Sequence, residues 1–565
     1  MAERNEDLPN DRKMAYRIGV NLGDVIEEGD RIYGDGVNIA ARLESLAEPG
    51  GICISGFVYN QIKNRLKLEY GFMGDQSVKN IKEPIPVYRI LSLPKTAIRP
   101  SVQEEQSYSV SEKPSVVVIP FANISGDPKQ EYFSDGMTEE IINALAHVEG
   151  LKVISRTSSF FFKGKDVDLR TIGEKLSVDN VIEGSVRKAG NRLRITAQLI
   201  KVTDDTHLWS EAYDRELEDV FAIQDEISHA IVDSLKIRLF GKEKGPLVRT
   251  YTENIEAYDS YIKGRYFFQG FMGGGLEKAL QHYKQAIELD PGYAPAYSAI
   301  AEYSFYLPFA DQEVSKDDAY EKSMEAIKKA LEIDSNLPEA HANLGMLKFH
   351  YEWDWKCAEK AFETAISLNP GLSKPHYDYA FYLTIKGDAD KSLLEARKAV
   401  ELDPLSGLPH HNLGKSLYYS GQFHQALREF RQAHEMMPVS LPNITTLAYT
   451  YYAKDMFEEA MDVIIKGLEI FPRHALLLSH MGHIKAQINE KDKTQEILDE
   501  LLERSEKEYV TPFAITSLYT DLGEMDKAYE YLEMGYEKRD IYFPFFRLAY
   551  FSDPQFDAFF KKIGL

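Results

Sequence analysis

The stretch GLPHHNLGKSLYYSGQFHQALREFRQAHEMMP at residues 407–438 decides the fold of the C-terminal half of the chain. In it, the small residues Gly414, Ala426 and Ala433 alternate with large apolar residues such as Leu413 and Phe430. Small residues let two helices approach closely, and large apolar ones fill the space between neighbouring hairpins. The stretch therefore predicts a helical hairpin that stacks on similar hairpins.

The same pattern recurs along the chain. Prolines stand at 370, 404, 438 and 472, each 34 residues after the one before. Proline suits a helix start, so each one marks the beginning of a new unit. An earlier unit ends at Pro291, and the next at Ser335, a longer gap that predicts an insertion around 307–318.

This period and these offsets resemble the tetratricopeptide repeat over roughly residues 255–540. The resemblance implies an all-α tetratricopeptide-repeat solenoid, here predicted at residues 253–542, with a C-terminal cap at 543–565. It also implies a groove lined by the first helix of each hairpin, which binds a protein or peptide. The groove-facing positions predicted for binding a partner are Tyr377, His411, Lys415, Tyr418, Tyr449 and Tyr452.

Tyrosine suits a recognition surface, because it offers a large amphipathic contact area at low entropic cost. The alternative for each of these side chains is that it packs between repeats or faces water. We weigh the two interpretations equally for any single residue.

Residues 114–243 alternate between strand-like and helix-like segments and follow a polar linker predicted at 94–113. The segments KPSVVVIPFANISGDPKQEYFSDGMTEEIINALAHVEGLKVISR and VIEGSVRKAGNRLRITAQLI resemble the TolB-like domain. We expect a small α/β domain that positions its neighbours. Within it, Asp135 or Thr138 is predicted to open a helix, and Lys188–Asn191 to form a turn between two strands.

Residues 14–92 include RIGVNLGDVIEEGDRIYGDGVNIAARLESLAEPGGICISGFVYNQI and SVKNIKEPIPVYRI. They are similar to the C-terminal half of a class III nucleotide cyclase catalytic domain. The resemblance assigns Asn38 to the ribose and Arg42 to the charge on the transferring phosphate, a task that suits the planar guanidinium. Lys79 is a weaker candidate for a phosphate contact, with Lys82 nearly as well placed. Where adenine-specific relatives carry an aspartate this chain has Arg31, and the adjacent Asp30 is the candidate for this contact with the substrate.

The family also needs two metal-binding aspartates and an adenine-reading lysine, which would precede residue 1. We therefore expect a partial α/β module at residues 1–93, no metal or cofactor in this chain, and no activity by itself. Two Mg or Mn ions are implied only for a complete cyclase dimer. One account is a misassigned start or a truncated gene, which we favour. The other is a remnant that supplies Asn38 and Arg42 in trans to a cyclase-domain partner.

Composition limits the remaining function classes. The chain has 565 residues and a formal net charge of −23, which argues against binding to nucleic acid or to an anionic membrane. Cys53 and Cys357 form no disulfide framework, and neither a secretory signal nor a membrane-spanning stretch is present. A cytoplasmic location follows as an expectation.

Together these patterns predict a multidomain protein: a partial cyclase-like module, a small α/β TolB-like domain and an all-α solenoid. The predicted function is signal transduction, with the repeats binding a protein partner. The alternative is an active class III adenylate cyclase that converts ATP to cyclic AMP. This alternative requires an upstream start or a partner chain that supplies the metal site. A nucleic-acid-binding regulator is disfavoured by charge and by the lack of a recognition motif.

Overall fold

The computed structural model describes residues 17–21, 26–28, 31–33, 35–48, 51–62, 69–76, 85–92, 113–237, 247–268, 275–310 and 314–540, together with residues 556 and 561. The chain divides into two compact units, Met1–Ser109 and Val110–Leu565. Each unit is described by itself. Asp30, Lys79 and most of the predicted linker and cap lie outside the described residues.

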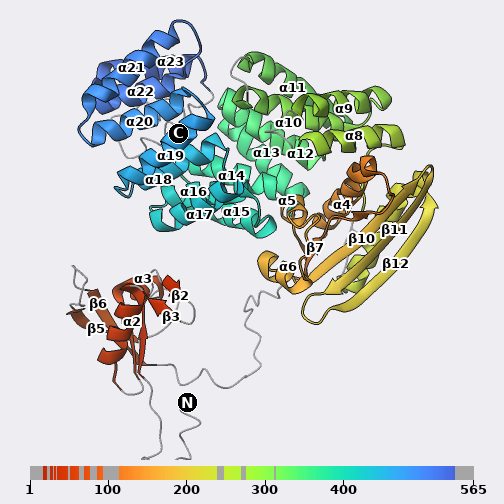
Figure 1. Cartoon of the computed structure of the whole chain (residues 1–565), viewed down its shortest axis with the longest axis horizontal. Coiled ribbons are helices and arrows are strands. Elements are labelled where there is room, and N and C mark those ends of the chain that lie inside the picture. Colours follow the sequence, from red (N-terminus) through yellow and green to blue (C-terminus); the bar gives the residue numbers. More distant parts are fainter. Residues whose placement is uncertain are drawn as a thin grey trace, which may run out of the picture. The chain divides into compact units, whose positions relative to one another are not determined.

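The N-terminal unit is a small layered α/β structure (Figure 1). Its elements are β1 (Ile18–Val20), β2 (Ile26–Glu28), β3 (Arg31–Tyr33), α2 (Asp35–Leu46), β4 (Ile52–Ser55), α3 (Gly56–Ile62), β5 (Glu69–Gln76) and β6 (Ile85–Ser92). One sheet has the order β1-β4-β6-β5, with β1 and β4 parallel and the other pairs antiparallel; β2 and β3 form a separate hairpin. Helix α2 packs so close to β1 that a Cβ on Gly19 would lie 2.1 Å from the Ala40 carbonyl oxygen. The core between them contains Leu43, Cys53 and Val87.

The middle domain, residues 113–237, is built around a six-stranded sheet. Its elements are β7 (Ser115–Val118), β8 (Ala122–Asn123), η1 (Pro128–Gln130), α4 (Glu131–Ala146), β9 (Lys152–Val153), α5 (Arg156–Phe160), α6 (Leu169–Leu176), β10 (Asn180–Ala189), β11 (Arg192–Lys201), β12 (Thr206–Glu216), η2 (Leu217–Asp219) and α7 (Val220–Ser234). The strand order is β12-β11-β10-β7-β9, and β8 pairs with β10. The predicted turn at Lys188–Asn191 is confirmed, because it joins the antiparallel strands β10 and β11.

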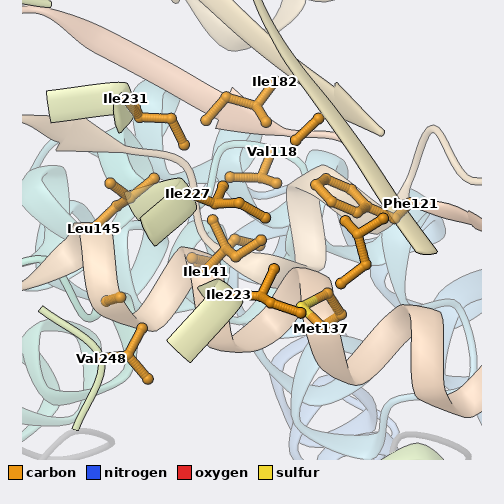
Figure 2. Close-up of a cluster of buried hydrophobic side chains, with 14 of the residues drawn as sticks. Val118, Phe121, Met137, Ile141, Leu145, Ile182, Ile223, Ile227, Ile231 and Val248 are labelled. Atoms are coloured by element: carbon orange, nitrogen blue, oxygen red, sulfur yellow. The ribbon is translucent and has the colours of Figure 1, made fainter. Parts of the chain in front are cut away.

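Helices α4 and α7 cover one face of this sheet and bury its main core. Figure 2 shows Ile141 of α4 and Ile227 of α7 among side chains that include Val118 and Ile182 of the strands. These four side chains are fully buried, as expected for a sheet face covered by two helices.

The predicted start of α4 is wrong. The helix begins at Glu131, so Asp135 and Thr138 lie inside it. Asp135 pairs with Lys163, and the Thr138 hydroxyl accepts a hydrogen bond from the Phe121 backbone amide at 2.9 Å. Both side chains have the chemistry of helix caps, but contacts distant in sequence engage them instead.

The rest of the unit is all-helical and forms eight hairpins among the described residues. In chain order the helix pairs are α8 (Ile255–Phe268) and α9 (Leu276–Leu289), α10 (Ala294–Ala310) and α11 (Lys316–Ile333), α12 (Pro338–Leu347) and α13 (Trp355–Leu368), α14 (Ser373–Lys386) and α15 (Ala389–Leu402), α16 (Gly407–Tyr419) and α17 (Phe423–Met436), α18 (Leu441–Tyr452) and α19 (Phe457–Ile470), α20 (Ala475–Gln487) and α21 (Lys491–Ser505), and α22 (Pro512–Leu522) and α23 (Met525–Glu537). A π-helical turn, η4 (Lys348–Glu352), extends α12. The predicted insertion corresponds to the longer second hairpin, in which α10 and α11 have 17 and 18 residues.

The small residues of the repeat have the predicted role. A Cβ on Gly414 would lie 2.7 Å from the Phe430 ring of the paired helix, and one on Gly345 would lie 2.6 Å from the Phe362 ring. Such distances leave no room for a side chain, so these positions must stay small.

Two histidines that lie 34 residues apart make equivalent contacts in two consecutive hairpins. His376 faces Glu395 at 2.6 Å through Nδ1 and the Pro370 carbonyl at 3.0 Å through Nε2. His410 faces Glu429 at 2.7 Å and the Pro404 carbonyl at 2.8 Å through the corresponding nitrogens. Each imidazole thereby ties the two helices of its hairpin to the turn that precedes them.

The middle domain docks on the turns between repeats. The Asp403 carboxylate accepts hydrogen bonds from the backbone amide and hydroxyl of Ser158 at 2.9 and 2.6 Å. One repeat earlier, a Cβ on Gly371 would lie 2.4 Å from the Ala146 carbonyl oxygen at the end of α4. Because consecutive turns present their backbone to α4 and α5, the middle domain and the repeats form one unit.

A buried ion-pair cluster reinforces this interface. Glu139 of α4 is 6% exposed and receives hydrogen bonds from Arg265 of α8 at 2.7 and 3.1 Å. On its other oxygen it pairs with Arg156 of α5 at 2.9 Å. Burial alone would raise the pKa of Glu139, but the two guanidinium groups more than offset it, so the pKa is lowered.

The solenoid curves until its last hairpin meets its second and third (Figure 1). Lys316 at the start of α11 donates hydrogen bonds to the carbonyl oxygens of Lys538 and Arg539, just after α23. Arg539 donates to the Glu352 carbonyl at 2.8 Å, and the Trp353 and Tyr536 rings lie 5.6 Å apart. We call this set of contacts the closure contact.

No helix within the described ranges is long and apolar enough to cross a membrane. Within the predicted cap, the structure describes Phe556. Its side chain is fully buried against the core of the last hairpins, and its ring lies 5.5 Å from that of Tyr529.

Candidate functional site

A cavity of about 120 Å³ opens among the first helices of the later hairpins. Helices α16, α18, α20 and α22 contribute most of its wall. The lining residues are Lys415, Tyr418, Tyr419, Phe430, Leu441, Pro442, Thr445, Thr446, Tyr449, Thr450, Leu476, His480 and Phe513. We call this cavity the repeat pocket. Its floor is buried and its rim, which includes Tyr418, Pro442 and Tyr449, is partly or fully exposed.

The threonines of α18 present an apolar surface to the repeat pocket. The hydroxyls of Thr445 and Thr446 both donate to the Pro442 carbonyl oxygen, at 3.0 and 2.8 Å, and that of Thr450 donates to the Thr446 carbonyl oxygen at 2.8 Å. Because each hydroxyl is engaged by its own helix, the pocket loses polar character that the sequence alone would assign to it.

Lys415 is the most unusual group in this wall. It is 6% exposed, and its Nζ lies 3.9 Å from the centroid of the Phe381 ring. Burial disfavours the charged amine and lowers the pKa of Lys415 to about 7. One turn earlier, His411 is 2% exposed, and its pKa is lowered well below the usual range, first by burial and then by Lys415.

A histidine and tyrosine cluster borders the pocket on α18 and α20. Tyr449 lies edge-on to His480 at 4.8 Å, and Tyr452 lies 4.5 Å from His483. The Asp521 carboxylate of α22 accepts from His483 Nδ1 at 2.7 Å. Burial lowers the pKa of His480 to about 3, so this imidazole is neutral at physiological pH.

The structure brings together three of the six residues predicted for partner binding, since Lys415, Tyr418 and Tyr449 line one cavity. Tyr452 is not in the lining, and its ring lies 6.2 Å from that of Tyr449. His411 lies under Thr446 at 3.5 Å and is buried, so it fits the alternative of packing between repeats. Tyr377 belongs to α14 and is partly exposed outside the lining.

Sequence reasoning missed the apolar part of the wall. Leu441, Leu476 and Phe513 lie at or near the starts of α18, α20 and α22, at related places in consecutive repeats. Their recurrence after each inter-repeat turn is a signal that could have identified them. Apolar residues at helix starts are nevertheless more often assigned to the core.

The second predicted site lies in the N-terminal unit. Asn38 and Arg42 both belong to α2, four positions apart. Arg42 is exposed. Asp30 and Lys79 lie outside the described residues, and within the described ranges no group of three His, Cys, Asp or Glu side chains is placed to hold a metal ion. The assigned roles of all four residues stay predictions.

Two regions of the chain match known protein families. Residues 1–92 match the adenylate and guanylate cyclase catalytic domain. Residues 111–230 match the second domain of HilA/YgeH-like transcriptional regulators. Residues 1–92 are therefore similar to an adenylate and guanylate cyclase catalytic domain, and a mixed-sheet domain and an all-helical repeat region follow them.

Individual relatives add detail. The chain is 38% identical over 346 residues to the protein named "Putative adenylate cyclase 3" of Rhizobium meliloti, covering 61% of this chain and 59% of that protein. An adenylate/guanylate cyclase/hydrolase from Silicibacter pomeroyi is 43% identical, covers 16% of this chain and 54% of its own, and has a TM-score of 0.16. A tetratricopeptide repeat protein from Parabacteroides merdae is 15% identical, with coverage of 47% and 99% and a TM-score of 0.34. The chain thus spans about three fifths of the curated relative.

Proposed function

We propose that this chain is a cytoplasmic signal-transduction protein whose helical repeats bind a segment of a partner protein. The observation that carries the proposal is the repeat pocket. A rim that includes Tyr418 and Tyr449 surrounds a buried, mostly apolar interior on the first helices of four consecutive hairpins. Recognition sites often have this anatomy, in which a few well-packed anchors supply most of the affinity.

The cyclase segment supports the signalling part of the proposal. Within residues 14–92 the resemblance provides counterparts of the asparagine and arginine, at Asn38 and Arg42, and none of the two metal-binding aspartates. We propose that this segment is inactive by itself. The TolB-like assignment of the middle domain stays a prediction, supported by its order of strands and helices.

A binding experiment tests the partner site. Dodecapeptides are selected from a random displayed library on the whole chain, and their affinities are then measured with synthetic peptides by calorimetry. We expect the double substitution Tyr418→Ala and Tyr449→Ala to weaken binding by about 100-fold or more, since central aromatic anchors each contribute about 2 kcal/mol or more.

The matched control is Tyr266→Ala, which removes a tyrosine that is 44% exposed on α8. It should leave the affinities unchanged, and circular dichroism should show both variants folded. Unchanged binding by the folded double variant would refute the assignment of this face.

A second candidate function, cyclic AMP formation, is favoured by the family match of residues 1–92. The test is an assay of the purified chain with ATP and manganese, alone and mixed with a full-length class III cyclase. We expect no product from the chain alone and no added product in the mixture.

Product from the chain alone would overturn the proposed inactivity. Stimulation that appears only in the mixture, and that is lost in Arg42→Ala, would instead establish that Asn38 and Arg42 act in trans. The exposed position of Arg42 makes this variant a safe one for folding.

A further inference from the structure

The repeat pocket has the dimensions of one side chain. Its volume is about 120 Å³. An apolar cavity of roughly 150 Å³ in another protein stays dry and accepts benzene. A cavity of this size therefore has room for a leucine-sized or phenyl-sized group, and not for a folded element.

The chemistry of the pocket walls further limits which ligand groups can bind. Leu441, Leu476 and Phe513 supply aliphatic and aromatic surface from three successive first helices. The threonine hydroxyls of α18 are committed to backbone carbonyl oxygens, so the methyl groups are left for contact. His480 packs against the ring of Tyr449 and has a pKa far below neutrality. A ligand with its own hydrogen-bonding groups would lose its hydrogen bonds to water in the pocket and form few new ones with the walls.

The competing possibility is a ligand with a carboxylate, because the Lys415 amine in the pocket wall could pair with it. The Lys415 ammonium lies over the Phe381 ring, which already solvates the charge in part. Burial also brings its pKa close to neutrality, so the group is not a permanent cation. Both facts weaken the case for an acidic occupant and favour an uncharged one.

We infer that the repeat pocket seats one uncharged apolar side chain, of leucine or phenylalanine size, from the protein segment bound by the repeats. The inference rests on the proposed function and deepens it, because it names the anchor that a partner must carry. The partly exposed rings of Tyr418 and Tyr449 would then pack against the anchor at the rim of the pocket and contribute to its binding.

The test uses amino-acid amides as probes with the full chain. N-acetyl-leucinamide, N-acetyl-phenylalaninamide, N-acetyl-alaninamide and N-acetyl-aspartamide (free side-chain carboxylate) are titrated and followed by saturation-transfer NMR. We expect the leucine or the phenylalanine probe to bind at least about tenfold more tightly than the alanine probe, since each buried methylene strengthens binding several-fold. Preference for the aspartate probe would overturn the inference.

Two substitutions test whether the probes bind in the repeat pocket. Thr446→Phe places a ring into the cavity and should abolish probe binding. Leu394→Ala removes an apolar side chain that is 67% exposed on α15 and controls for adsorption to the surface. Probe binding that survives Thr446→Phe, or is lost in Leu394→Ala, would refute the site.

The outcomes also separate this inference from the proposed function. If the amides fail to bind but selected peptides still depend on Tyr418 and Tyr449, the repeats bind a partner without this anchor, and the inference alone fails. If the amides bind in the pocket but no peptide does, the pocket exists and the proposed function fails.

Discussion

The substitution Glu139→Ala is expected to lower the free energy of unfolding of the Val110–Leu565 unit by about 3–5 kcal/mol. Glu139 is buried between Arg156 and Arg265, which come from two different parts of the unit. Removing it leaves two partly buried guanidinium groups facing each other without their shared carboxylate. Breaking such a cluster from one side costs far more than replacing all of it with apolar residues.

Urea unfolding of the whole chain measures this effect. The control is Glu131→Ala on the same helix, where the carboxylate pairs with Lys163 and its side chain is 37% exposed. Because Lys163 keeps Asp135 as a partner, the control should cost less than about 1 kcal/mol. Similar losses in the two variants would show that Glu139 does not hold the middle domain to the repeats.

Stability of the native chain relative to the variant Lys415→Met is expected to rise between about pH 7 and pH 10. The pKa of Lys415 is about 7 in the folded chain and 10.5 as its ordinary value. In this window the folded chain has lost a proton that the unfolded chain still binds, so raising the pH favours folding. Below pH 7 both states bind the proton, and the folded state bears the full cost of a buried charge.

One pKa unit corresponds to about 1.4 kcal/mol, so roughly 5 kcal/mol is the upper limit of this effect. Melting temperatures at pH 6, 8 and 10 measure it. The melting temperature of Lys415→Met should exceed that of the native chain most at pH 6, and this difference should shrink as the pH rises. The control Lys466→Met, whose side chain is 68% exposed, should show a difference that hardly changes with pH. A constant difference for Lys415→Met would contradict the buried charge.

The repeat architecture could be predicted from sequence because its determinants are local and periodic. A small residue recurs every 34 residues at Ala380, Gly414 and Ala448, and this period alone indicates which helices pair. Lys415, Tyr418 and Tyr449 were placed on the groove by the same counting, and they do line one cavity. The repeat period predicts which face of a helix a residue occupies, but not how deeply its side chain is buried. His411 was assigned to the groove in this way and is buried beneath it.

The interface between the middle domain and the repeats could not be predicted, because its partners are far apart in sequence. Asp403 has the appearance of an ordinary inter-repeat turn residue, and only the fold places Ser158 against it. The same holds for Glu139 and Arg265. The start of α4 was misplaced for a related reason, since Thr138 has cap chemistry but bonds instead to Phe121, a residue of the preceding loop.

The closure contact changes how the solenoid should assemble. In a solenoid with separate ends each repeat contacts only its neighbours, so folding can start anywhere and spread. Here Lys316 meets the backbone of Lys538 and Arg539, more than two hundred residues further along the chain. Joining residues so distant in sequence carries a high loop-closure entropy until the intervening hairpins have formed. The closure contact should therefore form last, and because it links the last hairpin to the second and third, removal of the final hairpin should also destabilise α11.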